Sequence, residues 1–133
     1  RTFPASGKFT SEQRASYELV LAAQAAAVAK LKAGVYYEDL VEAAKDVFRK
    51  AGRIDDFTHG LGHLVGLDVH DVGDMAKPLP AGAVITIEPG LYAQSANIGI
   101  RIEDLYLITQ TGSQRLSEGV PRSVEEVEAA MAR

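Results

Sequence analysis

The sequence predicts an α+β fold, because helix-forming segments come first in the chain and strand-forming segments follow them. Residues 10–33 and 38–50 carry apolar side chains at helical spacing. Residues 84–93 and 98–109 are rich in β-branched side chains that roughly alternate with other residues. Neither an internal repeat nor a low-complexity stretch interrupts this order. The 133 residues therefore suit one domain with a hydrophobic core.

Two helices are expected in the first part of the chain. The first is expected to begin at Thr10, which forms a T-x-x-Q capping box with Gln13, and to end at Gly34. Its apolar positions are Tyr17, Val20, Leu21, Val28 and Leu31. The second is expected over Glu38–Lys50, and Gly52 follows its end. The short connection between them predicts an αα-hairpin.

Two long strands are expected in the second part. They cover Val84–Ala93 and Ile98–Thr109, and the Pro- and Gly-containing stretch Met75–Ala83 is expected to be a loop. In the second strand the apolar alternation slips, because its isoleucines and its leucines occupy positions of opposite parity. This slip predicts a face switch or a bulge near Asp104.

A short strand and a short helix are expected to end the chain. A T-G-S turn at Thr111–Ser113 leads to a strand at Gln114–Leu116. The segment SVEEVEAAMAR, residues 123–133, predicts an acidic helix with Ser123 as its N-cap and Glu126 three residues later.

Composition excludes several classes of protein. The net charge of −4 without a basic stripe argues against a nucleic-acid partner. There is no cysteine, which excludes a disulfide scaffold and fits a reducing, cytoplasmic compartment. The longest apolar run, residues 19–32, is too short and too interrupted to span a bilayer. The chain opens on Arg1 and without a signal peptide, so we interpret it as processed, cleaved or truncated.

All three histidines lie in one glycine-rich stretch, Thr58–Asp71. His59 and His63 have the spacing of two ligands on one helix face. Three glycines oppose a helix, each costing about 1 kcal/mol relative to alanine, so the stretch is expected to be extended. In an unbroken strand His63 and His70 would face opposite sides, and they reach one site only if the chain bends at Gly66. The alternative is that they are polar residues of a glycine-rich loop.

Two glutamates sit inside apolar strands. Glu88 ends one strand before a Pro-Gly pair, and Glu103 follows Arg101 by two residues in the other. Buried carboxylates are costly unless they are paired or bind a metal, although each glutamate taken singly suits a solvent-facing position. Imidazole with several carboxylates suits Mn²⁺, Co²⁺, Mg²⁺ or Zn²⁺. Two ions held by bridging carboxylates can generate hydroxide from water and stabilise a developing oxyanion.

Three sequence blocks resemble those of the pita-bread metallopeptidases, in the branch of the Xaa-Pro aminopeptidases and the Xaa-Pro dipeptidases (prolidases). The blocks are THGLGHLVGLDVHDVG, ITIEPGLY and GIRIEDLYLIT, and the resemblance extends to the tail VPRSVEEVEAAM. The form R-I-E-D of the third block is similar to that of the proline peptidases and differs from methionine aminopeptidases. The resemblance implies the C-terminal portion of the pita-bread (creatinase/aminopeptidase) fold, an antiparallel curved sheet packed with helices and incomplete in this chain, with residues 1–133 part of one catalytic domain.

The resemblance also implies a metal site with two divalent ions, Mn²⁺ being preferred to Zn²⁺ or Co²⁺. By motif position the metal ligands are His63, Glu88 and Glu103. The family uses five ligands, and the two aspartates belong to blocks that precede the segment matched here. The aspartates near and within the histidine block do not match those motif positions. The chain is therefore expected to supply three of five ligands and to be inactive alone.

Further site residues follow from the same resemblance. Glu88 is also implied as a proton shuttle, which makes it a catalytic residue as well as a ligand. His59 and His70 are implied as catalytic, substrate-binding histidines that hold the scissile carbonyl and assist the leaving proline nitrogen. Arg101 is implied as a catalytic residue that orients the site beside Glu103, and Tyr92 as a residue that lines the substrate site.

The function implied is metal-dependent hydrolysis of the peptide bond preceding proline, of the Xaa-Pro dipeptidase type. The alternatives are aminopeptidase P activity on longer Xaa-Pro peptides and a non-catalytic pita-bread binding module. The expected partners are a proline-containing di- or oligopeptide substrate and a complementary N-terminal fragment that covers an exposed apolar sheet edge. The full enzyme is expected to be a homodimer, with no nucleic-acid or membrane partner.

Overall fold

The computed structural model describes residues 1–132, and Arg133, the last residue of the expected C-terminal helix, lies outside the described residues. The helices are α1 (Ser11–Val28), α2 (Tyr37–Lys50) and α3 (Val124–Met131), with 3-10 turns η1 (Ile54–Asp56) and η2 (Gln94–Ala96). The strands are β1 (Leu64–Val65), β2 (Val84–Ile87), β3 (Gly90–Ala93), β4 (Ile98–Arg101), β5 (Asp104–Ile108) and β6 (Ser113–Arg115). The expected α+β class is confirmed.

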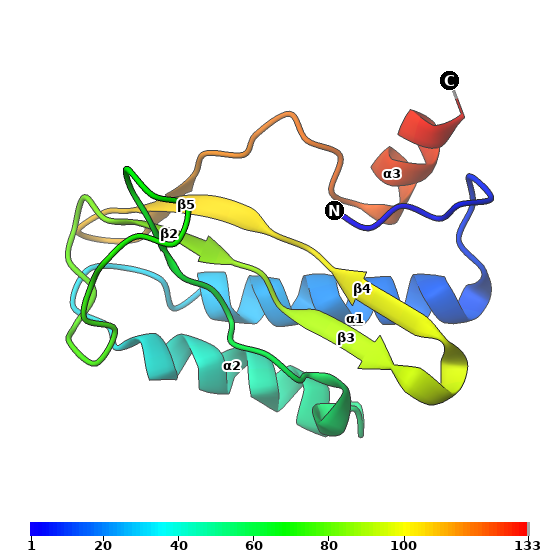
Figure 1. Cartoon of the computed structure of the whole chain (residues 1–133), viewed down its shortest axis with the longest axis horizontal. Helices are drawn as coiled ribbons and strands as arrows, with labels where there is room; N and C mark the ends of the chain where they lie inside the picture. The colour runs from blue at the N-terminus through cyan, green and yellow to red at the C-terminus, as the bar shows by residue number, and fades with distance from the viewer. Residues whose placement is uncertain (133) are drawn as a thin grey trace.

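The helices α1 and α2 lie side by side and run along the strands (Figure 1). The capping box of Thr10 and Gln13 is present at the start of α1. This helix ends at Val28, earlier than Gly34, because the backbone after it is bonded elsewhere: Ala33 N–H donates to the Thr109 carbonyl and Gly34 N–H to the Leu79 carbonyl. These bonds attach the end of the first helical segment to the residue after β5 and to the loop before β2.

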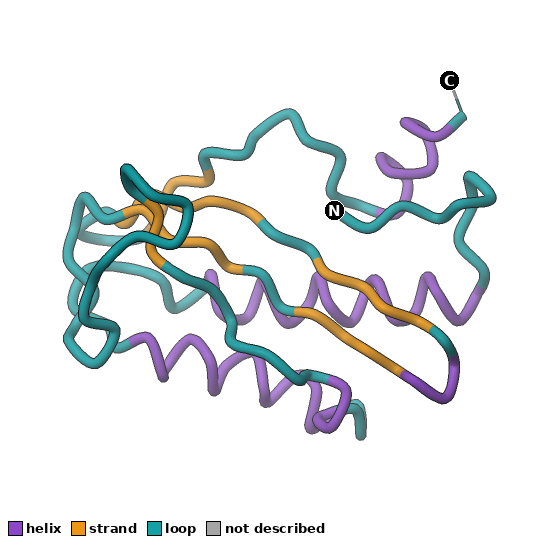
Figure 2. Tube along the Cα trace, in the orientation of Figure 1, coloured by secondary structure: helices purple, strands orange, loops and turns teal. Residues whose placement is uncertain are grey.

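The strands form one four-stranded antiparallel sheet in the order β1-β2-β5-β6 and one two-stranded sheet of β3 and β4. The two long strands expected from the sequence are both present, but each is interrupted at the same level (Figure 2). Ile87 pairs with Asp104 on one side of the interruption and Gly90 pairs with Arg101 on the other. Two residues intervene on each strand, so the register is unchanged across the gap. We call this gap, residues 88–89 and 102–103, the strand break.

The face switch expected near Asp104 is wrong. Burial alternates without interruption through the break, and the buried positions are Ile100, Ile102, Asp104, Tyr106 and Ile108. Asp104 faces inward at 0 % exposure because Arg1 and Ser117 donate to its carboxylate and Arg122 lies 3.3 Å from it. Burial alone would raise the pKa of Asp104, but the hydrogen bonds from Ser117 and Arg1 outweigh it and hold that pKa below its usual value.

The remaining elements agree with expectation to within two residues. The stretch Met75–Ala83 contains no strand, and Gly82 adopts a positive φ of 88° before β2 begins. The last strand lies at Ser113–Arg115, and α3 has the expected capping box of Ser123 with Glu126. Apolar side chains from α1, α2 and the inner face of the strands form one core. No helix among residues 1–132 is long and apolar enough to cross a membrane.

Candidate metal centre

Glu88 and Glu103 face each other across the strand break. The unchanged register places Glu88 opposite Glu103, and Ile102 N–H donates to the Pro89 carbonyl at 3.4 Å. Pro89 has no N–H to offer to a partner strand, so it suits a position where the ladder opens. The break therefore brings two carboxylates together from residues far apart in the sequence.

His63 reaches the same place from the segment that leads into β1. This segment runs along β2, where Glu88 N–H donates to the Leu61 carbonyl at 2.7 Å and Thr86 N–H to the His63 carbonyl at 2.9 Å. Gly62 makes that approach feasible, because a Cβ there would lie 1.9 Å from the Thr86 carbonyl oxygen. The expectation that glycine marks a close backbone contact is confirmed.

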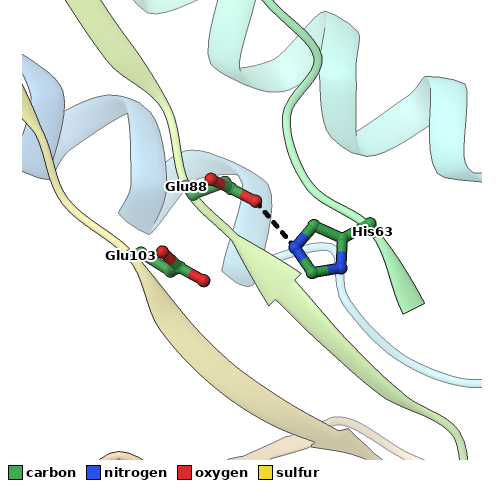
Figure 3. Close-up of side chains that lie close together, drawn as sticks. All are labelled: His63, Glu88 and Glu103. Carbon is green, nitrogen blue, oxygen red and sulfur yellow. Dashed lines mark ion pairs between the residues drawn. The ribbon is translucent and has the colours of Figure 1, made fainter. Parts of the chain in front are cut away.

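The three side chains converge on one point (Figure 3). One ligand atom from each of His63, Glu88 and Glu103 lies within 4.8 Å of the others, and His63 Nε2 is 3.3 Å from Glu88 Oε1. His63 Nδ1–H donates to the Leu64 carbonyl at 3.0 Å, which orients the ring so that Nε2 faces the carboxylates. Thr86 Oγ1 donates to Glu88 Oε1 at 2.9 Å. An imidazole nitrogen with two carboxylates fits a hard or borderline divalent ion.

His70 joins His63 because the chain folds back after β1. Asp71 N–H donates to the Leu64 carbonyl at 3.0 Å, and the Asp71 carboxylate accepts from Leu67 N–H at 3.1 Å. The rings of His63 and His70 then lie 4.0 Å apart between centroids. A Cβ at Gly66 would lie 1.6 Å from Asp71 Oδ2, so the expected bend at this glycine is confirmed.

His59 packs edge-on against Phe57 and Tyr92, with its ring centroid 5.4 Å from the centroid of each. Its Nδ1–H donates to the Gly60 carbonyl at 2.7 Å. Its Nε2 is buried and has no hydrogen-bond partner among residues 1–132. A Cβ at Gly90 would lie 2.5 Å from this Nε2, so the glycine leaves the space that the imidazole occupies.

Arg101 contacts the opposite glutamate rather than the nearby one. Its Nη1 lies 3.6 Å from Glu88 Oε2, and its Nε–H donates to the Tyr92 hydroxyl at 2.8 Å. The guanidinium carbon is 5.8 Å from the centre of the Tyr92 ring. Tyr92 thus orients Arg101 toward Glu88, which lies on the strand opposite that of Arg101.

Three side chains at the site were not expected from the sequence: Thr86, Gln24 and Tyr37. Thr86 accepts from His63 N–H at 2.9 Å in addition to holding Glu88. Its position two residues before Glu88 puts both on one strand face, which is the signal that could have found it. Gln24 is the one polar residue in the alanine-rich part of α1 that lies at the spacing of the apolar stripe.

A comparison with protein families identifies the chain. The family model described as metallopeptidase family M24 matches residues 1–110. The chain belongs to metallopeptidase family M24.

Relatives of this M24 chain are named as aminopeptidases. The Xaa-Pro aminopeptidase of Haemophilus influenzae is 38 % identical over 98 % of this chain and 37 % of its own length. Xaa-Pro aminopeptidase 2 of Streptomyces coelicolor is 39 % identical over 100 % of this chain and 35 % of its own length. The chain thus spans little more than a third of the curated relatives it matches.

The fold agrees with solved structures of the same family. A variant of Escherichia coli aminopeptidase P in complex with substrate superposes with a TM-score of 0.89, at 34 % identity, over 99 % of this chain and 37 % of that one. The expected pita-bread architecture is therefore confirmed for this portion of the fold.

Proposed function

We propose that this chain provides the histidine and glutamate ligands of a dinuclear metal centre that hydrolyses the peptide bond preceding proline. The observation that carries the proposal is the convergence of His63, Glu88 and Glu103 in a member of family M24. The donor type supports it, because His63 presents its Nε2 and both glutamates present carboxylate oxygens to the same point. Such a convergence is not needed by a non-catalytic binding module.

Divalent ions at this position, Mn²⁺ or in its place Zn²⁺ or Co²⁺, would polarise the scissile carbonyl and lower the pKa of a water molecule. His63, Glu88 and Glu103 would hold them. Glu88 has a second role as a proton shuttle, for which its side chain is held by Thr86 on one oxygen and approached by Arg101 on the other. Both contacts come from side chains of the chain itself, so the carboxylate is oriented in advance.

The two other histidines are proposed to contact the peptide. His70 stacks near His63, and His59 offers a buried Nε2 that has no partner among residues 1–132. We assign them to the scissile carbonyl and to the leaving proline nitrogen. An Xaa-Pro bond is a tertiary amide without an N–H, so recognition has to come from groups that act on the carbonyl and on the ring nitrogen. Tyr92, beside His59, lines this side of the site.

Between the two peptide classes we propose the aminopeptidase P class, which acts on Xaa-Pro peptides longer than two residues. The support is that the curated relatives of this chain carry the name Xaa-Pro aminopeptidase. The dipeptidase type, the first expectation from the sequence, stays an alternative. The complementary N-terminal fragment, the homodimer and the inactivity of the chain alone also stay predictions.

The decisive experiment is metal binding by the chain. Calorimetric titration with Mn²⁺ and Co²⁺ is expected to show binding that Glu103→Gln weakens by about 10-fold or more, because the substitution keeps the shape and removes a ligand charge. Glu118→Gln, which makes the same exchange at an exposed position outside the cluster, is expected to leave binding unchanged. Equal affinities for the two variants would remove Glu103 from the ligand set.

The activity is tested with paired peptides. The chain, alone and together with the preceding part of the Haemophilus influenzae relative, is incubated with Xaa-Pro-Xaa and Xaa-Ala-Xaa peptides and with an Xaa-Pro dipeptide. Release of the first residue from Xaa-Pro-Xaa only, abolished by a chelator and restored by Mn²⁺, is expected. Cleavage that survives chelation would contradict the proposal, and preferred cleavage of the dipeptide would select the dipeptidase alternative.

A further inference from the structure

The backbone just before each of the three candidate ligands is held by a polar side chain from the helix layer. His63, Glu88 and Glu103 follow Gly62, Ile87 and Ile102 respectively. Gln24 of α1 bonds the peptides of the two isoleucines, and Tyr37 of α2 bonds that of the glycine. In Figure 3, α1 lies behind the strands that carry the two glutamates.

Gln24 bridges the two strands at the point where their own ladder opens. It is fully buried, and its Nε2 donates to the Ile87 carbonyl at 2.9 Å and to the Ile102 carbonyl at 3.2 Å. These are the last carbonyls before Glu88 and Glu103. One amide group therefore fixes the spacing of the two strands where the carboxylates leave them.

Arg122 fixes the orientation of that amide. Its Nε and Nη2 groups donate to Gln24 Oε1 at 3.1 and 2.7 Å. A guanidinium can only donate hydrogen bonds, so the oxygen of the amide has to face Arg122 and the NH₂ group has to face the strands. Both protons of the NH₂ group then have an acceptor, and the buried amide is satisfied.

Tyr37 does the same for the histidine segment. Its hydroxyl accepts from Gly62 N–H at 2.8 Å and donates to the Gly62 carbonyl at 3.0 Å, so it satisfies both polar groups of one peptide residue. Burial raises the pKa of Tyr37 in spite of its backbone hydrogen bonds, so the hydroxyl keeps the proton that it donates. Gly62 has no side chain that could hold it, because it lies too close to β2 for a Cβ. Its position therefore depends on the hydroxyl of Tyr37.

We propose that Gln24 and Tyr37 are positioning residues of the metal centre, which together set the distances among His63, Glu88 and Glu103. This inference rests on the proposed metal site. Ligand geometry tolerates errors of only a few tenths of an ångström, and groups that orient the ligands commonly change metal affinity by about 10- to 100-fold when they are removed. A residue that only satisfied buried backbone groups would change stability and leave the coordination as it was.

The first test replaces Gln24 by methionine, which keeps the length and volume and removes the donor and the acceptor. Binding of Co²⁺ is measured by calorimetry, and the coordination is read from the visible absorption of the bound ion. Gln24→Met is expected to weaken binding by about 10- to 100-fold and to shift the absorption bands. The control is Val20→Ala, one turn earlier on α1, which deletes a buried apolar group and is expected to lower the melting temperature without changing either metal readout.

The second test uses a smaller change, in case the glutamine variant does not fold. Tyr37→Phe removes one hydroxyl and is expected to weaken Co²⁺ binding and to shift the spectrum. Tyr36→Phe makes the same exchange on the neighbouring exposed ring and is expected to change neither. Parent-like affinity and spectrum in folded Gln24→Met or Tyr37→Phe would overturn the inference while leaving the metal site standing. A parent chain that binds no Co²⁺, even together with the preceding part of the Haemophilus influenzae relative, would overturn the proposed metal site and this inference with it.

Discussion

The strand break and the loop after β1 both contribute to the site, but they are held in different ways. At the break, Glu88 is 8 % exposed, and Gln24, Thr86 and Asp104 beside it are buried and hydrogen-bonded. In the loop, residues 66–73, the apolar side chains Leu67, Val69 and Val72 stand in solvent, with exposures of 105, 71 and 89 %. The loop is fixed mainly through Asp71, whose backbone and carboxylate close the turn.

This difference separates two tasks. The candidate metal ligands are attached to backbone that the core holds, as a site with fixed ligand distances requires. His70, assigned to the substrate, is attached to a segment with few buried contacts, which belongs to the part of a protein that opens most easily. The boundary lies within the histidine stretch, between Val65 and Gly66.

The largest effect is expected where charge is buried beside the break. Asp104→Asn should lower the free energy of unfolding by about 3–5 kcal/mol, because it leaves the guanidinium of Arg1, whose side chain is 3 % exposed, without its counter-charge. Asp46→Asn makes the same exchange in a pair that is exposed on both sides and should cost less than about 1 kcal/mol. Urea unfolding measures both. An equal loss of unfolding free energy in the two variants would mean that the buried ion pairs of Asp104 do not stabilise this region.

A second pair of variants locates the boundary between the held and the exposed part. Leu61 is 0 % exposed and Leu67 is fully exposed, six residues further along the same glycine-rich stretch. Leu61→Ala should lower the free energy of unfolding by about 2–5 kcal/mol and Leu67→Ala by no more than about 0.5 kcal/mol. A comparable loss in thermal and urea unfolding for both leucines would show that the loop is packed against something in solution, and the contrast drawn above would fail.

The smallest effect is expected from one methyl group. Gly62→Ala places a Cβ 1.9 Å from the Thr86 carbonyl oxygen, so the His63 segment has to move away from β2, at a cost of about 1–3 kcal/mol. Gly112→Ala meets no atom within 4 Å and should change stability by less than about 1 kcal/mol. Unfolding and Co²⁺ titration are measured together, since the first variant should also weaken metal binding. Parent-like binding by Gly62→Ala would show that the ligand does not depend on this contact.

Much of the fold and the members of the candidate ligand cluster could be predicted from the sequence. Capping boxes, glycine stops and β-branched runs are local signals, and they located the helices and strands to within a few residues. His63, Glu88 and Glu103 were found because each sits in a block with a specific order of residues. The sequence made the approach of His70 to His63 conditional on a bend at Gly66 and left a polar loop as the alternative; in the structure the two rings lie together.

The errors and omissions concern residues whose partners are distant in the sequence. The apparent slip at Asp104 looked like a face switch because Leu105 and Leu107 have the opposite parity to the isoleucines. The buried face instead continues through the carboxylate of Asp104, whose partners Arg1 and Arg122 come from the two ends of the chain. Gln24 looked like an interruption of an alanine-rich helix for the same reason: the carbonyls it binds lie 63 and 78 residues further along. No local pattern carries that information.

The unchanged register across the strand break has a consequence for how chain length can vary. Glu88 and Glu103 oppose each other only while β3 and β4, which connect them to the η2 turn, keep the same length as each other. A one-residue slip on one strand would turn the side chains of that strand to the other face. An insertion at Gln94–Asn97 extends the tip of the hairpin and leaves both strand lengths intact, whereas an insertion in β3 or β4 alone does not. Related chains are therefore expected to vary in length at the tip of the β3–β4 hairpin and to keep a constant number of residues within each of its two strands.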